Sequence, residues 1–188
     1  GEAPLQTAYI RSLCSDGKSR IWIALNDRLL ESRFPYHEYT SIKLPSPNGK
    51  PSYINSFFYE KGKERLWICT SNGIFVYTDS TQELRHLPPV GQTNSPVTLF
   101  QDRDGRYWLT TWGEGLWQLL TDETLRHVEY IHQDIQSPRG KVADSKFFST
   151  SQDDTFGYIW ALSYNNLYAF QYDDRTGKLI PVALPKYI

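Results

Sequence analysis

Residues 106–119 read RYWLTTWGEGLWQL, in which Trp108 lies between apolar neighbours and a glycine-containing turn leads into a second apolar run. The same order recurs in three other stretches: 20–30 (RIWIALNDRLL), 65–77 (RLWICTSNGIFVY) and 158–170 (YIWALSYNNLYAF). Their tryptophans, Trp22, Trp67, Trp108 and Trp160, are 45, 41 and 52 residues apart. A unit of about 45 residues therefore recurs four times, and this is the period of β-propeller blades.

Each unit carries signals for four antiparallel strands. The second strand holds the tryptophan, and the third follows a turn such as Asn72-Gly73, which is a strong hairpin signal. The first strands are predicted at 9–13, 53–59, 97–100 and 145–150, each leading to a polar turn, and the fourth at 36–44, 82–87, 124–131 and 178–184. Pro181 suits only an edge strand, so the fourth strand is expected to be outermost.

These signals predict an all-β fold with almost no helix. We expect four four-stranded antiparallel sheets, which form β-propeller blades at approximately 5–48, 49–92, 93–138 and 139–188 of a single segment, 1–188. A lone sheet leaves both faces wet, whereas stacked sheets cover one another. One tryptophan per blade, which buries on the order of 150–250 Å², is therefore interpreted as the structural filling between blades.

Composition excludes several classes of protein. The 188 residues have a formal net charge of −1, which gives no electrostatic reason to expect nucleic acid as a partner. The sequence has no apolar run long enough for a membrane helix, and it shows no signal peptide. Because it begins at Gly1 without Met, we expect a segment of something longer. Cys14 and Cys69 lie in apolar runs and are expected to be thiols rather than a disulfide.

The repeated pattern resembles the two-component regulator propeller repeat, and residues 102–119 (DRDGRYWLTTWGEGLWQL) carry the resemblance best. Residues 65–77 match well, and the first and last units match more loosely. The resemblance implies the periplasmic sensor region of a Bacteroides-type hybrid two-component sensor histidine kinase/response regulator, in which such propellers precede a β-sandwich domain and respond to oligosaccharides. It also implies a larger, seven-bladed-type propeller. Four blades would then be part of a ring, close alone, or pair with a second copy.

No catalytic motif is present, so this segment is not expected to be an enzyme. The histidines fall in or near the predicted fourth strands and are interpreted as solvated, not as metal ligands: His37, His86, His127 and His132. Asp102, Asp104, Asp153 and Asp154 lie in turns without the spacing of a calcium loop, so turn chemistry explains them. We expect no metal and no cofactor.

Topology predicts where a ligand would bind. In an antiparallel blade, the turn between the second and third strands lies at the same end as the connection to the next blade. Loops on a rigid scaffold commonly carry recognition. The candidate ligand-binding residues at that end are Arg28, Asn72, Trp112, Glu114, Tyr164 and Asn165. An aromatic side chain surrounded by Asn, Arg and Glu suits sugar hydroxyls.

Three functions remain open at this stage. The first is a non-enzymatic oligosaccharide-sensing module in the periplasm, with neighbouring propeller or β-sandwich domains as partners. The second is a protein-interaction scaffold that pairs through exposed blade edges, as in a homodimer. The third is a carbohydrate-active enzyme on a propeller fold, because a fold alone does not decide function.

Overall fold

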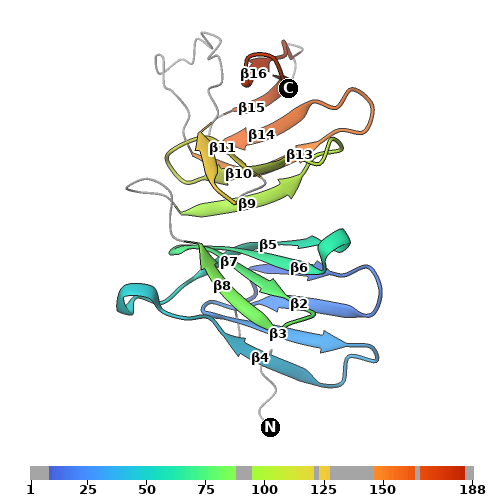
Figure 1. Cartoon of the computed structure of the whole chain (residues 1–188), viewed down its shortest axis with the longest axis vertical. Coiled ribbons are helices and arrows are strands. Elements are labelled where there is room, and N and C mark those ends of the chain that lie inside the picture. The colour runs from blue at the N-terminus through green and yellow to red at the C-terminus, as the bar shows by residue number, and fades with distance from the viewer. Residues whose placement is uncertain (1–8, 88–94, 121–122, 128–145, 164–165, 185–188) are drawn as a thin grey trace. The chain divides into compact units, whose positions relative to one another are not determined.

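The computed structural model describes residues 9–87, 95–120, 123–127, 146–163 and 166–184 (Figure 1). These residues form four antiparallel four-stranded sheets, each with its strands in chain order. The first two sheets contain β1 Ser12–Ser15, β2 Arg20–Ala24, β3 Arg28–Arg33 and β4 Tyr39–Lys43, then β5 Ile54–Glu60, β6 Arg65–Thr70, β7 Gly73–Thr78 and β8 Glu83–Leu87. The last two contain β9 Pro96–Gln101, β10 Tyr107–Thr111, β11 Leu116–Leu119 and β12 Leu125–His127, then β13 Phe147–Gln152, β14 Ile159–Ser163, β15 Leu167–Asp173 and β16 Lys178–Pro181.

The predicted fold class is confirmed. The helical elements within the described ranges are two short 3-10 turns, η1 Pro47–Gly49 and η2 Lys61–Lys63. None of the helices in this part of the chain is long and apolar enough to cross a bilayer. Pro181 lies in β16, the outermost strand of its sheet, as its missing N–H requires.

Two strand boundaries in the first sheet differ from prediction. The first strand is Ser12–Ser15 rather than 9–13, because the Asp16 carboxylate accepts hydrogen bonds from the N–H groups of Lys18 and Arg20 and fixes the turn. The fourth strand begins at Tyr39 rather than at residue 36, because residues 34–38 form a loop. The remainder of the predicted strand 124–131 beyond β12 lies outside the described residues.

The chain divides into two compact units, Gly1–Pro89 and Val90–Ile188. The first holds β1 to β8 and the second β9 to β16, and each has its own core. In the first unit, Trp22 is fully buried and stacks on Tyr59 of β5 at 4.9 Å between ring centroids. In the second, Trp108 is fully buried against Tyr172 of β15 at 5.0 Å. Burial of one indole contributes roughly 4–6 kcal/mol as an upper bound.

The repeated tryptophans therefore have the structural role that the sequence predicts. Trp67 is also buried, at 1% exposure, whereas Trp160 is only half-buried. In both units the tryptophan face of the first sheet packs on the next sheet, through Trp22 and Ile54 in one core and through Trp108 and Phe147 in the other.

An acidic residue before each tryptophan strand organises the preceding turn. The indole N–H groups of Trp67, Trp108 and Trp160 donate to Glu60 at 3.0 Å, Asp102 at 2.8 Å and Asp153 at 3.2 Å. Asp102 and Asp153 also accept backbone N–H groups of their own turns, which confirms turn chemistry for these two residues. Trp22 differs, since its buried indole nitrogen has no partner among the described residues and Asp16 pairs with Arg20 instead.

Both cysteines are free thiols, as predicted. Cys69 is buried in β6, and burial raises the pKa of its thiol to about 12. Cys14 in β1 is only half-buried, because its strand lies at the edge of its sheet. Burial also raises the pKa of Cys14, so neither side chain favours the reactive thiolate form near neutral pH.

Candidate functional site

The end of the blades predicted to bind ligands is assembled as expected within each unit. In the first unit, the N–H of Ile54 donates to the carbonyl of Asn26 at 2.9 Å, so the β2–β3 turn lies against the connection from β4 to β5. In the second unit, the N–H of Trp112 donates to the carbonyl of Ser95 at 3.0 Å. Each hairpin turn is thus held beside an inter-blade connection by backbone hydrogen bonds.

Asn72 holds this end of the first unit together. Its side-chain amide donates to the carbonyls of Lys50 at 3.0 Å and Pro51 at 2.9 Å. Its main-chain carbonyl accepts a 2.7 Å hydrogen bond from the His86 ring. His86 also stacks on Phe75 at 4.6 Å and is half-buried, so the expectation of a solvated histidine is wrong there. The amide group of Asn72 is therefore occupied by the fold.

The other predicted ligand residues are more accessible. The Arg28 side chain is 48% exposed, with its Nε 3.5 Å from Asp27. Trp112 is 38% exposed and packs edge-on against Phe148 at 4.7 Å, while Lys146 lies 5.6 Å from the centre of the indole ring. Glu114 is half-buried. Tyr164 and Asn165 lie outside the described residues.

The predicted ligand residues are divided between the two units. Arg28 and Asn72 belong to the first unit, and Trp112 and Glu114 belong to the second. Within the second unit, Trp112, Phe148 and Lys146 form a partly exposed aromatic surface with a cation beside it. Such a surface can stack on the apolar face of a ligand ring.

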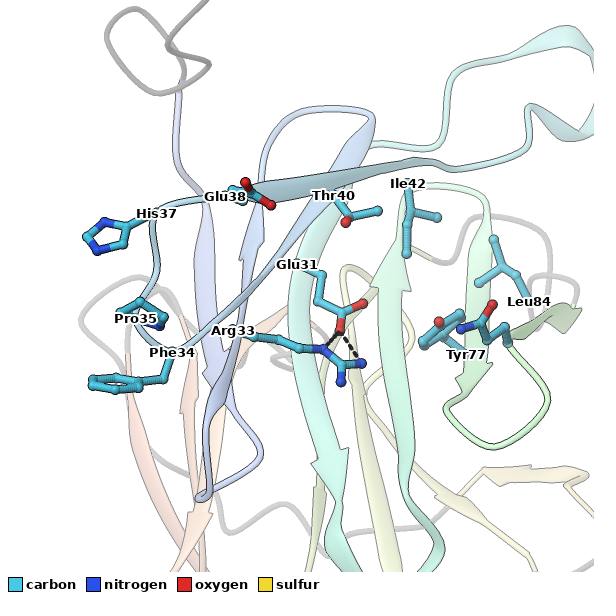
Figure 2. A pocket seen from close by; sticks show the side chains of 11 residues that line it. Glu31, Arg33, Phe34, Pro35, His37, Glu38, Thr40, Ile42, Tyr77 and Leu84 are labelled. Carbon is cyan, nitrogen blue, oxygen red and sulfur yellow. Dashed lines mark hydrogen bonds and ion pairs between the residues drawn. The ribbon is translucent and has the colours of Figure 1, made fainter. Parts of the chain in front are cut away.

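A pocket of about 730 Å³ lies in the first unit, at the opposite end of the strands from the predicted face. Its size falls within the range of small-molecule sites. The lining residues come from β3, β4, β7, the start of β8 and the loops between them: Glu31, Arg33, Phe34, Pro35, His37, Glu38, Thr40, Ile42, Tyr77, Gln82 and Leu84. Figure 2 shows Glu31 and Arg33 on one side of the pocket and Tyr77 and Leu84 across from them.

Glu31 is the most buried charged group that lines this pocket. Its side chain is only 11% exposed, and its carboxylate pairs with Arg33 at 3.2 Å and with Arg20 at 3.6 Å. Tyr77 is buried at 7% exposure. Burial, followed by the carboxylates of Glu31 and Asp79, raises the pKa of the Tyr77 phenol, so this side chain stays neutral.

Arg20 connects the pocket to the contact between the two sheets of the first unit. Its guanidinium pairs with Asp16 at 3.1 Å and with Asp79, which follows β7, at 2.9 Å. Burial and then the hydrogen bond to Asp79 raise the pKa of Tyr59 to about 12. Although burial opposes it, the hydrogen bonds with Asp79 and Asp16 raise the pKa of Arg20, which therefore remains a fixed cation.

Sequence reasoning missed this pocket. The sequence pattern predicts a strand at 36–44 and a solvated His37. It also predicts that ligands bind at the other end of the blades. One signal is present: the first sheet has a longer stretch, with Pro35, between its third and fourth strands than the Asp79–Gln82 turn of the second sheet. Among the described residues, no three His, Cys, Asp or Glu side chains are grouped to hold a metal ion.

Comparison with known proteins supports the family resemblance. Residues 91–113 match the family model of the two component regulator propeller. The extracellular domain of the hybrid two-component system BT4673 from Bacteroides thetaiotaomicron is 21% identical, with a TM-score of 0.73 over 90% of this chain and 22% of that chain. The corresponding domain of BT3049 from the same species is 18% identical, with a TM-score of 0.60 over 97% and 30%.

An enzyme shares the fold as well. Virginiamycin B lyase from Staphylococcus aureus is 13% identical, with a TM-score of 0.71 over 97% of this chain and 58% of that chain.

No curated protein matches the sequence. The chain spans less than two thirds of each of these structures, and about a fifth of BT4673. The resemblance to the two-component regulator propeller repeat and the propeller-type fold are therefore confirmed.

Proposed function

We propose that this chain is a non-enzymatic ligand-sensing segment of a two-component receptor and lies in the periplasm. The observation that carries the proposal is the match of residues 91–113 to the two-component regulator propeller, in a chain whose described residues form four sheets of that type. The similarity to extracellular domains of hybrid two-component systems supports the same role. Signalling would follow from a ligand that binds one arrangement of the receptor better than another.

The proposed ligand is an oligosaccharide. Trp112 supports this choice, because its ring is partly exposed and Lys146 lies close to it. A pyranose ring has an apolar face that stacks on an indole and hydroxyl groups that pair with charged side chains. Arg28 in the first unit and Glu114 in the second are proposed to take part in recognition, each within its own unit. Tyr164 and Asn165 are proposed with them from the sequence and lie outside the described residues.

The proposal is tested by screening the protein against hexasaccharides of glucose, xylose, mannose and galactose, with calorimetry on each compound that binds. Replacement of Trp112 by Ala is expected to weaken binding five- to tenfold, the equivalent of about 1–1.5 kcal/mol of lost stacking. Phe156→Ala is the matched control, since Phe156 is 68% exposed at the other end of β14 and stacks on Tyr158 within its turn. Affinity should not change in this control.

Other outcomes of the screen select the rival functions. Cleavage of a bound saccharide would favour an enzyme, which the similarity to virginiamycin B lyase brings into consideration. Failure of every saccharide to bind, together with a dimer mass in light scattering, would favour a scaffold that pairs with a second copy. That alternative has structural support, since Leu162 and Ile180 of the last sheet are 47% and 42% exposed.

A further inference from the structure

The pocket in the first unit is lined by a short side chain at a position where the second unit carries a long one. In the first sheet, Trp22 on β2 pairs in register with Glu31 on β3, which pairs with Thr40 on β4. In the third sheet, Trp108 pairs with Gln118, which pairs with Arg126 on β12. Thr40 and Arg126 thus occupy the same position relative to the repeated tryptophan, in the outermost strand of each sheet.

Arg126 bridges its two neighbouring sheets in the second unit. Its guanidinium donates to the side-chain oxygen of Gln118 and to the hydroxyl of Tyr172 on β15, the latter at 2.9 Å. The Thr40 side chain is several bonds shorter and lines the pocket instead of crossing it. The position that a long cation takes in one unit is therefore open space in the other.

The walls of this pocket combine an apolar surface with uncommitted polar groups. Ile42, Tyr77 and Leu84 supply the apolar part (Figure 2). The side chains of Glu38, Thr40 and Gln82 line the pocket and have no hydrogen-bond partner among the described residues. Such groups provide hydrogen bonds to a ligand without breaking any that the fold requires.

Charge in the pocket argues against a strongly ionic ligand. The Glu31 carboxylate, the most buried charge in the lining, is already paired with Arg33 and Arg20. A charged ligand would compete with these ion pairs. Leaving one member of a buried pair without its partner costs free energy. An uncharged ligand with several hydroxyl groups fits without this cost.

The mouth of the pocket is held in a defined shape. Tyr36 has φ of 64° and Gln82 has φ of 55°, in the left-handed region that bulky side chains rarely adopt. The N–H of Tyr36 donates to the carbonyl of Arg33 at 2.6 Å, and the hydroxyl of Ser32 donates to the carbonyl of Glu38 at 2.7 Å. Backbone held in sparsely populated conformations clusters at ligand sites, where the surrounding structure fixes it.

From these observations we infer that the pocket between β3–β4 and β7–β8 is a second saccharide site, which binds one uncharged sugar ring. The ring packs on Tyr77, Ile42 and Leu84, and its hydroxyl groups bond Glu38, Thr40 and Gln82. This inference rests on the proposed function and adds a site in the first unit, whereas Trp112 belongs to the second.

The test is Thr40→Arg, which places in the first unit the side chain that the second unit carries at Arg126. The new guanidinium would lie beside Glu31 and fill the pocket. Binding of the saccharide selected from the hexasaccharide panel is expected to fall at least tenfold in calorimetry. Ser41→Arg is the matched control: Ser41 is the exposed neighbour on β4 and points to the other face of the sheet, so affinity should stay within twofold.

Two further variants keep the test decisive if Thr40→Arg does not fold. Gln82→Ala and Glu38→Gln alter exposed pocket groups and are each expected to weaken binding three- to tenfold. Unchanged affinity in Thr40→Arg, or in both of these variants, would overturn the pocket site. If Trp112→Ala alone weakens binding, the proposed function stands and only the pocket is lost. If no hexasaccharide binds, both fail.

Discussion

At the scale of single residues, the acidic residue before three of the four tryptophans makes a hydrogen bond that the sequence alone does not predict. The Asp side chains close their turns by accepting backbone N–H groups. In three of the four sheets, the acidic side chain accepts the indole N–H as well. The buried nitrogen of the tryptophan is thereby paired, which avoids a cost of about 1–3 kcal/mol. Asp102 lies six residues before Trp108. Because a turn already accounts for Asp102 in the sequence, this spacing alone does not predict the hydrogen bond to the indole.

Asp16 makes the residue-scale account testable through pH. Burial favours the neutral carboxyl, but hydrogen bonds from Lys18 and Arg20 outweigh it and hold the pKa of Asp16 below its usual value. Its stabilising contribution is therefore complete above the unfolded-state pKa and is lost as pH falls through the lower folded-state pKa. Asp16→Asn is expected to reduce the free energy of unfolding by about 1–3 kcal/mol at pH 7.

Urea denaturation between pH 7 and pH 2 measures this effect. The free-energy difference between the natural protein and Asp16→Asn should shrink as the pH drops below about 4. Asp154→Asn is the control, because Asp154 is exposed in the corresponding turn of the last sheet and should change stability by less than about 0.5 kcal/mol. A difference that stays constant down to pH 2 would show that the charge of Asp16 does not matter.

At the scale of elements, ion pairs join neighbouring sheets at matching places in the two units. Arg20 on β2 reaches Asp79 beyond β7, and Arg106, which directly precedes β10, reaches Asp174 beyond β15 at 2.7 Å. The two pairs differ in burial: the Arg20 side chain is 12% exposed and that of Asp79 is 8% exposed, whereas Asp174 is 75% exposed. Removing one partner from the pair in the first unit should therefore cost more stability than removing one from the pair in the second.

Arg20→Ala tests the role of the buried pair in the first unit. It leaves Asp16 and Asp79 without their shared cation in a largely buried environment, so the free energy of unfolding should fall by about 2–4 kcal/mol. Arg28→Ala serves as the control, since its side chain is 48% exposed and its change should stay within about 0.5 kcal/mol in urea denaturation. Equal effects of the two substitutions would show that Arg20 does not join the sheets.

At the scale of the whole molecule, the sequence predicts the architecture well because the tryptophan spacing and hairpin turns are local signals. It predicts β5 to within one residue at each end, and it places Pro181 correctly at an edge. It does not predict the pocket, because that space depends on what Thr40 leaves open between two sheets. It also does not predict that Asn72 is occupied by carbonyls of the preceding connection. Both depend on contacts between segments far apart in the chain.

The last sheet shows what a tryptophan face is like when no described sheet covers it. Trp160 is half-buried and Leu162 is 47% exposed, whereas Trp108 on the covered face of the third sheet is fully buried. Within the second unit, the covered third sheet therefore buries its tryptophan more completely than the uncovered last sheet does. This difference agrees with the general behaviour of repeat proteins, in which each unit is stabilised by the next.

The central claim is that the indoles of Trp22 and Trp108 are sealed between neighbouring sheets. Hydrogen exchange of the indole N–H groups, followed by NMR with each signal assigned from a Trp→Phe variant, tests it most directly. Trp22 and Trp108 are 0% exposed, so their indole protons should exchange at least a hundredfold more slowly than that of Trp112, which is 38% exposed. Exchange of Trp22 and Trp108 as fast as that of Trp112 would contradict the account.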